Sequence, residues 1–515
     1  MMIDSLKHQF WQKLSFFIFI FWASGCNNTQ QNTTFAEASG EELAQIYCKS
    51  CHAYASPSLL PKSTWKTYIL PRMGYLMGIY DQENSRESLI GTGAEATQLE
   101  KAMVYPSQPL LSTKEWQSIQ NYILTQAPDT LPTTPTTESI GLTLFNTQIP
   151  NYKLSPPSTT LAQFANDGYI WIGDANTKAL YRFGKDLQMS GAANLQEGVV
   201  HLLPSPQSLI LTVMGSFSPT EAPTGFIMSL PQDPRQAPRV LLDSLKRPVH
   251  TAYGDLNGDG RTDLAVAEFA RYTGKLAWYA QQADGSFETH ILRNKTGATR
   301  VISIDIDGDQ DLDLMALFAQ GDEGIFLYEN DGKGNFQEKR LLTFPPTYGS
   351  SYMEILDLDN DGKWEILYTC GDNADYPPVL KPYHGIRIFK DKGNLDYQED
   401  WFYPLPGAYK AIPADFDQDG DLDFAAISFF PDYLNHPKAG FHFLENQGDF
   451  TFKAATFEEA DLGRWLTLDA GDMDQDGDLD LVLGSLTFEA PAQPAYVDLW
   501  VKNGIPFVVL ENQSR

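Results

Sequence analysis

Short apolar runs separated by polar turns recur along the C-terminal two-thirds of the chain. Runs such as Leu264–Ala267 and Leu481–Leu483 follow acidic turns, and segments such as Gly324–Phe336 and Gly440–Phe450 combine a strand with a hairpin. The pattern indicates four short strands in every ~50 residues. Four-stranded sheets repeated around a ring define a β-propeller, so the pattern predicts an all-β propeller over residues 149–515.

Acidic loops of nine residues precede the second strand of these repeats from residue 255 onward. Their first residues, at 255, 305, 357, 415 and 472, are 50, 52, 58 and 57 residues apart. Side-chain oxygens at positions 1, 3 and 5, a backbone carbonyl at 7 and an acid at 9 form an oxygen cage that suits Ca²⁺. The predicted ligands are Asp255, Asn257, Asp259, Asp263, Asp305, Asp307, Asp309, Asp313, Asp357, Asp359, Asp361, Glu365, Asp415, Asp417, Asp419, Asp423, Asp472, Asp474, Asp476 and Asp480.

The role expected for these ions is structural, because each would pin the loop between the first two strands of a blade. The alternative is a solvated turn without metal, but up to five carboxylates in one short loop repel each other strongly without a counter-ion. Gln310 replaces the glycine of the other loops, so we expect strain and weaker binding there. The longer side chain of Glu365 predicts a different ligand geometry in the third loop.

The repeats resemble FG-GAP (VCBS-type) propeller blades, and the resemblance covers residues 250–515. Upstream, Phe164–Phe183 and Val199–Leu230 have the strand spacing without the acidic loop, so we expect two degenerate blades there. Residues 149–515 number 367, and this length corresponds to seven blades of about 52 residues. We therefore predict seven blades, with six or eight as alternatives. The sequence does not predict how the ring closes.

Before residue 130 the spacing of apolar residues becomes helical. Glu41–Tyr47 indicates a short helix, and Ser112–Trp116 opens with a capping serine followed by a glutamate three positions later. Large apolar side chains at 116, 119, 122 and 123 continue one helical face. The pattern predicts a small all-α domain over residues 39–129 and a Pro/Thr-rich linker over residues 130–148.

The first of these helices leads directly into a C-x-x-C-H motif, formed by Cys48, Cys51 and His52. Two thiols at this spacing reach the two vinyl groups of one haem, and the adjacent imidazole falls on its iron. The region resembles a class I cytochrome c, which implies covalent haem c on Cys48 and Cys51 with His52 as the proximal ligand. A thiol–disulfide C-x-x-C is the weaker alternative, because no βαβ pattern follows and the histidine would be unexplained.

A sixth iron ligand is expected between the two helices. We favour Met73, in a segment where Pro71 stiffens the predicted loop and Gly74 permits close backbone approach. A thioether ligand would raise the potential into the electron-transfer range. Met77 and Met103 remain alternatives, and a methionine in such a place is also common as core filler.

The N-terminus has the layout of a secretory signal at residues 1–25. Lys7 and Lys13 precede a nine-residue apolar run at 14–22, which is too short to cross a bilayer, and small residues follow at 23–25. The next residue is Cys26, and this arrangement resembles the lipobox of bacterial lipoproteins. The resemblance implies a lipidated Cys26, a polar tether at 26–38, and an exported protein anchored to a bacterial membrane, most readily the outer membrane on its periplasmic or surface face. A plain secretory signal is the alternative.

Charge and cysteine usage sharpen this interpretation. The chain carries 37 basic and 66 acidic residues, a net charge of -29, which makes nucleic acid a poor partner. The five loops hold 22 of those acids, so bound Ca²⁺ would neutralise much of the excess. Of four cysteines, one is expected to carry lipid and two haem, which leaves Cys370 single and predicts no internal disulfide.

One further pattern points to a candidate ligand face. The residue five before the first loop aspartate is His250, Arg300, Tyr352 or Lys410 in successive blades, and Arg464 is close to the equivalent place in the last. Such residues at the mouth of a propeller channel suit a carbohydrate or anionic ligand, or a docking surface. The alternative is that strand ends simply carry polar residues.

The sequence thus predicts a multidomain protein: a small all-α cytochrome c-like domain followed by a propeller. The favoured function is a membrane-anchored c-type cytochrome for electron transfer to a redox partner protein, with a calcium-stabilised propeller that binds a partner or ligand rather than catalysing a reaction. The alternative is an oxidoreductase in which the propeller oxidises a substrate such as a sugar and passes electrons to the haem. An adhesion module with a vestigial haem is a third, weaker hypothesis.

Overall fold

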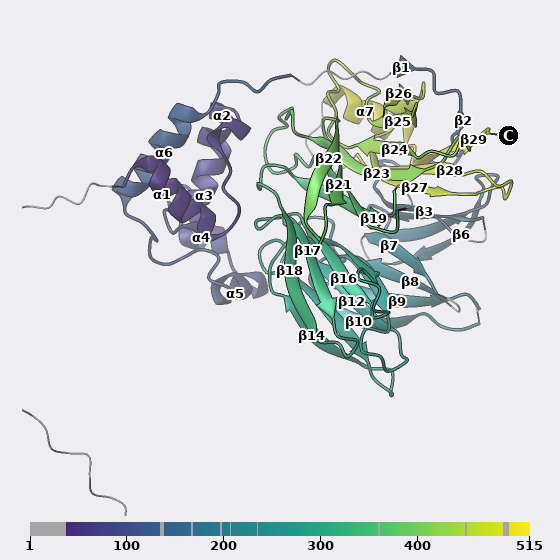
Figure 1. Ribbon diagram of the computed structural model, residues 1–515, viewed down its shortest axis with the longest axis horizontal. Helices are drawn as coiled ribbons and strands as arrows, with labels where there is room; N and C mark the ends of the chain where they lie inside the picture. The colour runs from purple at the N-terminus through teal and green to yellow at the C-terminus, as the bar shows by residue number, and fades with distance from the viewer. Residues whose placement is uncertain are drawn as a thin grey trace, which may run out of the picture. The chain divides into compact units, whose positions relative to one another are not determined.

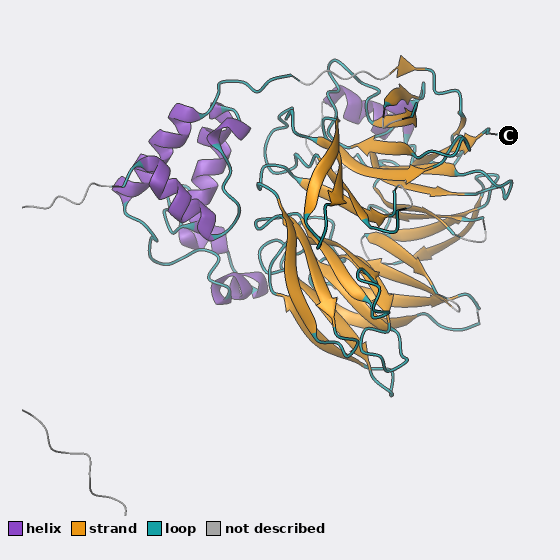
Figure 2. Ribbon diagram, viewed as in Figure 1, coloured by secondary structure: helices purple, strands orange, loops and turns teal. Residues whose placement is uncertain are grey.

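The computed structural model of the chain describes residues 38–133, 139–165, 168–195, 198–205, 208–233, 235–358, 361–448, 451–487 and 494–514 (Figure 1). The predicted signal peptide, Cys26 and the tether up to residue 37 lie outside the described residues. Helices occupy the part before residue 127, and strands dominate the part after residue 138 (Figure 2). Within the described ranges, none of the helices has the length and hydrophobicity needed to span a bilayer.

The helical part begins and ends with capped helices, as the sequence predicts. Ser39 and Ser112 each accept a hydrogen bond from the backbone N–H three residues on, and the glutamate at that position accepts one from the cap's own N–H. The elements in chain order are α1 (Gly40–Tyr47), η1 (Cys48–Ser50), η2 (Pro57–Leu59), α2 (Lys62–Thr64), η3 (Trp65–Ile69), α3 (Leu70–Leu76), α4 (Arg86–Ile90), α5 (Ala94–Lys101) and α6 (Thr113–Gln126).

The close packing of α1 on α6 depends on a glycine. A Cβ atom added to Gly40 would lie 2.2 Å from the carbonyl oxygen of Ser118 and 2.8 Å from Cβ of Tyr122. Only hydrogen fits between the two backbones, so the helices approach more closely than any other residue would allow. Around this crossing, Leu43, Trp116 and the rest of one apolar cluster form the core of the helical part.

The segment around Met73 differs from the predicted loop. Leu70–Leu76 forms helix α3, which continues directly from the π-helical turn η3 and has Pro71 near its start. Gly74 is buried, and a Cβ added there would lie 3.4 Å from the ring of Trp116. The glycine therefore does permit close approach, but by a helix rather than by a loop.

Seven sheets form the propeller, which confirms the predicted number of blades. The first two are the blades expected to lack acidic loops. Their strands are β3 (Thr159–Phe164), β4 (Ile170–Asp174), β5 (Ala179–Phe183) and β6 (Met189–Asn194), followed by β7 (Val199–Pro204), β8 (Ser208–Val213), β9 (Gly225–Pro231) and β10 (Arg239–Leu245).

The remaining five blades each contain one acidic loop between their first and second strands. Blades three to five comprise β11 (Pro248–Gly254), β12 (Asp263–Glu268), β13 (Lys275–Gln281) and β14 (Phe287–Arg293); β15 (Ala298–Ile304), β16 (Asp313–Phe318), β17 (Gly324–Asn330) and β18 (Phe336–Thr343); and β19 (Ser350–Leu356), β20 (Glu365–Cys370), β21 (Gly385–Asp391) and β22 (Tyr397–Pro404). Blades six and seven comprise β23 (Ala408–Ala414), β24 (Asp423–Ser428), β25 (Phe441–Asn446) and β26 (Phe452–Thr456); and β27 (Trp465–Gly471), β28 (Asp480–Ser485) and β29 (Phe507–Asn512), with helix α7 (Pro494–Asn503) between the last two strands.

The ring closes through strands that precede the first blade. β2 (Phe145–Gln148) pairs antiparallel with β29 and becomes the outermost strand of the seventh blade. β1 (Ser139–Ile140) pairs parallel with β26 and adds a fifth strand to the sixth blade. Both lie in the predicted linker at 130–148, so the second half of that segment contributes strands to the propeller.

The second strand of every blade with an acidic loop is buried along its whole length, in β12, β16, β20, β24 and β28. Neighbouring blades cover both faces of these strands, so their sequences are continuous apolar runs rather than alternating ones. The first strand of each blade borders the central axis, where its side chains face each other across the ring. The fold therefore leaves two kinds of candidate site, the acidic loops and the inner strands.

Candidate functional site

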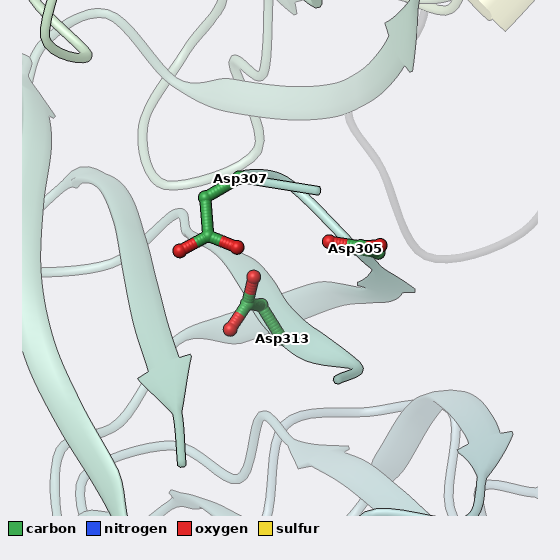
Figure 3. Close-up of side chains that lie close together, drawn as sticks. All are labelled: Asp305, Asp307 and Asp313. Carbon is green, nitrogen blue, oxygen red and sulfur yellow. The ribbon is translucent and has the colours of Figure 1, made fainter. Parts of the chain in front are cut away.

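The acidic loops bring carboxylates close together. In three of them, ligand oxygens of the carboxylates lie within 4.8 Å of one another: Asp305, Asp307 and Asp313; Asp415, Asp417 and Asp419; and Asp472, Asp474 and Asp480. Figure 3 shows the first group gathered between the end of β15 and the start of β16.

The first and third loops have a base at position 7, which pairs with the acid at position 5. Arg261 forms an ion pair with Asp259, and Lys363 lies 2.6 Å from Asp361. The three loops that gather carboxylates have an aspartate at position 7 instead. Asp359 of the third loop lies outside the described residues.

The carboxylate at position 9 has a structural role of its own. Asp480 accepts hydrogen bonds from the backbone N–H of Met473, at 2.8 Å, and of Asn512, at 2.9 Å. The acids at 263, 313 and 423 make the same pair of contacts. Glu365 accepts from Leu358 N at 2.8 Å, so its longer side chain reaches the same partner as the aspartates. Position 9 thus joins the loop to the hairpin that follows it.

The donor set fits a hard cation. Oδ1 of Asp415 and Oδ1 of Asp474 are buried and have no hydrogen-bond partner, which is costly for an ionised oxygen. Burial raises the pKa of Asp423 to about 7 and that of Asp480 to about 6, with the neighbouring loop acids adding to the shift. A divalent ion would supply the missing positive charge, and an all-oxygen set without cysteine or histidine suits Ca²⁺.

The expected strain at the second loop is present. Gln310 has φ of 77°, in the left-handed region where the equivalent Gly260, Gly362, Gly420 and Gly477 have φ between 80° and 101°. A side chain there costs roughly 1–2 kcal/mol relative to glycine.

Equivalent positions of the seven inner strands line one cavity of about 320 Å³. Each inner strand has a bulge at its second residue when it pairs with the next strand, and the third residue then lines the cavity. The seven residues at this third position are Leu161, His201, His250, Arg300, Tyr352, Lys410 and Thr467. Four of the five residues predicted for the ligand face are in this ring.

The fifth, Arg464, is elsewhere. Its side chain is fully buried, its guanidinium carbon lies 3.8 Å from the ring centre of Phe429, and its Nε donates to the carbonyl oxygen of Phe429. Arg464 precedes β27, and the ring position of this blade belongs to Thr467. Its role is therefore to pack the connection between the last two blades.

Acids two residues further along the inner strands lie near the cations of the ring. Arg300 forms an ion pair of 2.5 Å with Glu354, which also accepts a hydrogen bond of 2.6 Å from the Tyr352 hydroxyl. Lys410 donates to the carbonyl oxygen of Leu468 at 2.7 Å, and its charge acts to lower the pKa of Asp469, which burial raises. In each case a cation of one blade faces an acid of the next.

The two histidines of the ring are neutral. Their rings are stacked with centroids 3.8 Å apart. Burial, assisted by the positive charges of Arg300 and Lys410, lowers the pKa of His201 to about 3, and burial likewise lowers the pKa of His250. His250 Nε2 lies 3.1 Å from Arg300 Nη1 and must accept, because guanidinium nitrogens only donate.

Sequence reasoning missed three of these residues. His201 lies in a blade without an acidic loop, so counting back from a loop aspartate does not find it. Glu354 and Asp469 each lie two residues after the cavity-lining residue of their strand, which is Tyr352 or Thr467. Alignment of the inner strands with each other, instead of with the loops, would have indicated all three.

The C-x-x-C-H residues lie at the end of α1. Cys48 is buried in the apolar cluster of the helical part, and burial raises the pKa of its thiol to about 11. Cys51 is exposed, and both thiols are free, as is Cys370 in β20. Nδ1 of His52 lies 2.8 Å from the carbonyl oxygen of Ala53. Because a carbonyl oxygen can only accept, Nδ1 carries the proton and donates this hydrogen bond, which leaves Nε2 available as a ligand.

The three methionines named as sixth ligands have different surroundings. Met77 is buried in the same cluster as Cys48, and Met73 packs against that cluster. Met103 is 76% exposed and follows α5 with φ of 53°. Met73 and Met77 are thus better placed than Met103 to reach a group held by Cys48.

Together these features define a seven-bladed propeller with acidic loops on five blades and a polar cavity on its axis. The FG-GAP-like repeat model matches residues 255–316, 305–368 and 415–483, so the chain contains FG-GAP-like repeats. No curated protein sequence matches the chain.

Solved structures that are similar to this chain include the following three. A streptogramin B lyase is 13% identical, with 72% of this chain and 98% of the lyase covered and a TM-score of 0.46. The periplasmic gluconolactonase of Pseudomonas aeruginosa is 15% identical, with coverages of 66% and 89% and a TM-score of 0.39. Sqt1 of Saccharomyces cerevisiae is 9% identical, with coverages of 71% and 99% and a TM-score of 0.43.

Proposed function

We propose that this protein is a membrane-anchored c-type cytochrome for electron transfer, with a calcium-stabilised propeller that binds a partner or ligand. The observation that carries the proposal is the C-x-x-C-H motif at the end of α1. One thiol of this motif is buried in the core, the other is exposed, and the imidazole between core and surface has Nε2 free of the hydrogen bond that orients the ring.

The helical part offers what a haem requires of a protein. Cys48 and Cys51 would hold it by thioether bonds, His52 would ligate the iron, and Met73 or Met77 would complete the coordination. When bound, the haem supplies reversible one-electron chemistry. The hydrogen bond from His52 to Ala53 fixes the orientation of the imidazole. The apolar side chains around Cys48 would exclude water from a bound haem and so favour its reduced state.

Covalent haem staining of protein produced with export and haem-attachment machinery tests the proposal. Cys48→Ser with Cys51→Ser should abolish the stain, whereas Cys370→Ser, which changes the third described cysteine, should retain it. A stain that survives the double substitution would refute covalent attachment. Met73→Ala, Met77→Ala and Met103→Ala, examined one at a time, should show loss of the methionine–iron absorption band in only one variant.

Calcium belongs to the same proposal as a structural ion of the propeller. The support is the donor set of the three loops that gather carboxylates, including the buried unpaired oxygens of Asp415 and Asp474. A chelator should lower the melting temperature of the propeller, and Ca²⁺ should restore it more effectively than Mg²⁺. Equal melting with and without chelator would show that the loops need no ion.

The second candidate function is an oxidoreductase, and the observation that favours it is the cluster of titratable groups in the axial cavity. Electrons from a substrate oxidised there would pass to the haem. Anaerobic addition of sugars or alcohols to the calcium-loaded protein, followed by haem absorbance, separates the two candidates. Reduction of the haem by a substrate would favour the enzyme, and an unchanged oxidised spectrum, with and without added quinone, would favour the carrier.

Export and anchoring through Cys26 complete the proposal. The full chain should partition into the detergent phase and incorporate labelled fatty acid, and Cys26→Ser should do neither. Labelled fatty acid that persists in the Cys26→Ser variant would place the anchor elsewhere.

A further inference from the structure

The axial cavity of the propeller is built from charges that cancel. Three basic residues, Arg247, Arg300 and Lys410, and three acids, Glu354, Asp372 and Asp469, line or border it, so their formal charges balance. The strongest pairs are formed between neighbouring blades, as in Arg300 with Glu354. An anionic ligand would therefore enter a site that offers no net positive charge and whose cations already have partners.

The cavity instead presents donors and acceptors side by side. Nε2 of His250 accepts from Arg300, which puts the proton of this neutral ring on Nδ1. Nδ1 of His201 lies 3.4 Å from the backbone N–H of Thr251 and accepts from it, which leaves Nε2–H of His201 as a donor. The acceptor nitrogen of each histidine is thus already engaged, and the remaining N–H of His250 is itself buried. Nε2–H of His201 is therefore the ring donor left for a ligand hydroxyl, beside the carboxylate acceptors of Asp372 and Asp469 that line the cavity.

Aromatic rings supply the apolar part of the wall. Phe217, Phe269 and Tyr409 line the cavity near the connections between strands. Tyr352 lies within the ring itself, with the guanidinium carbon of Arg300 4.3 Å from its centre and Nζ of Lys410 at 5.1 Å. Such a wall suits a molecule whose C–H groups pack against the aromatic rings and whose hydroxyl groups bond the polar side chains. The volume of about 320 Å³ lies at the lower end of the roughly 300–1,000 Å³ typical of small-molecule sites.

We propose that the axial cavity binds a neutral, hydroxyl-rich small molecule, that is, a sugar or polyol of about monosaccharide size. This inference rests on the proposed function only in that it names the ligand class for the propeller. His201 and Lys410, whose ammonium keeps two further donors besides the one on Leu468, contribute hydrogen bonds to hydroxyl groups, and the aromatic residues pack against the carbon skeleton. The balance of acidic and basic residues around the cavity sets the preference for an uncharged ligand.

Ligand-observed NMR on the full-length, calcium-loaded protein tests the ligand class directly. The probes are glucose and mannitol as neutral compounds, glucuronate and inorganic phosphate as anions, and glucosamine as a cation, each at about 10 mM, above the dissociation constant of a weak, millimolar site. At least one neutral compound should bind at least about tenfold more tightly than glucuronate, a difference of about 1.4 kcal/mol. Tighter binding of glucuronate or phosphate, or no binding by either neutral compound, would overturn the inference.

Variants locate the binding and test the charge argument. Lys410→Met should weaken binding of the neutral compound at least about tenfold, and Lys392→Met, which removes an exposed lysine paired with Asp400, should leave it unchanged. Asp469→Asn makes the cavity net positive and should shift the preference toward glucuronate. An unchanged preference in Asp469→Asn would refute the charge argument even if sugar binds.

The outcome is separable from that of the proposed function, because haem staining is read on the same sample. A sample that stains for haem but binds no neutral sugar would refute only the ligand class. A sample that binds sugar without covalent haem would refute only the cytochrome.

Discussion

A buried histidine in the sixth blade makes the propeller sensitive to acid. His442 lies in β25 and its side chain is fully buried. Its Nδ1 is 3.4 Å from the hydroxyl of Tyr403, and its Nε2 is buried with no hydrogen-bond partner. Burial, and to a smaller extent the charge of His436, lowers the pKa of His442 to about 4.

The sign of the effect follows from proton uptake on unfolding. An unfolded histidine has a pKa near 6.5, so between pH 6.5 and 4 the unfolded chain binds a proton that folded His442 does not. The free energy of unfolding therefore falls as the pH is lowered through this window. With a folded pKa of about 4, the loss between pH 7 and pH 5 is about 2 kcal/mol for this residue.

Urea unfolding at pH 7, 6 and 5 in the presence of a chelator, with the wild type and His442→Gln, measures this contribution. The substitution has its own cost at every pH, but that cost cancels when the change with pH is compared. The wild type should lose about 2 kcal/mol more than His442→Gln between pH 7 and 5. Loop acids and His201 titrate in both proteins and cancel as well. Equal losses in the two proteins would refute the assignment of a neutral, buried His442.

Three further predictions concern the loops and the helical part. At a site of about 0.1–1 mM affinity, about 10 mM Ca²⁺ stabilises the fold by about 1.4–2.7 kcal/mol, and Asp474→Ala should remove this stabilisation. Urea unfolding in chelator should show no loss of stability in this variant, because the substitution also removes a buried, unpaired oxygen. An undiminished calcium response would contradict the role of Asp474 as a ligand. Gln310→Gly should raise stability by about 0.5–1 kcal/mol, since relief of the left-handed strain exceeds the added backbone entropy, and a lower melting temperature would show that the side chain is needed. Gly40→Ala should lower the melting temperature of the helical part, at a cost of about 1–3 kcal/mol, because the new methyl group would meet the carbonyl of Ser118. Gly191→Ala, which meets nothing within 4 Å, is the matched control, and an equal effect of both would contradict the packing argument.

Much of the propeller was predictable because its blades repeat with constant internal spacing. The offset of five residues from loop aspartate to cavity residue holds for His250, Arg300, Tyr352 and Lys410, since each inner strand has the same length and the same bulge. Arg464 breaks the rule because it lies eight residues before its loop, outside the strand. Where the loop itself is missing, as in the blade of His201, the offset has no starting point.

Ring closure and the cavity acids could not be predicted, because both depend on contacts between segments that are distant in sequence. β2 pairs with β29 across most of the chain, with Phe145 opposite Asn512, and neither strand has a local signal of its partner. Likewise, the pairing of Arg300 with Glu354 depends on the distance between adjacent blades, which no spacing within one blade defines.

One asparagine connects the acidic loops to ring closure. Asn512 in β29 donates its backbone N–H to Asp480 of its own blade, and its Nδ2 lies 2.8 Å from the carbonyl oxygen of Phe416 in the loop of the blade before. Asn330 makes the equivalent contact with Leu256, so the same link joins blades three and four. β29 also pairs with the closing strand β2. The last acidic loop is therefore hydrogen-bonded to the same strand that closes the ring. An ion bound in these loops would therefore stabilise the contacts between neighbouring blades, including those of the seventh blade, where the ring closes.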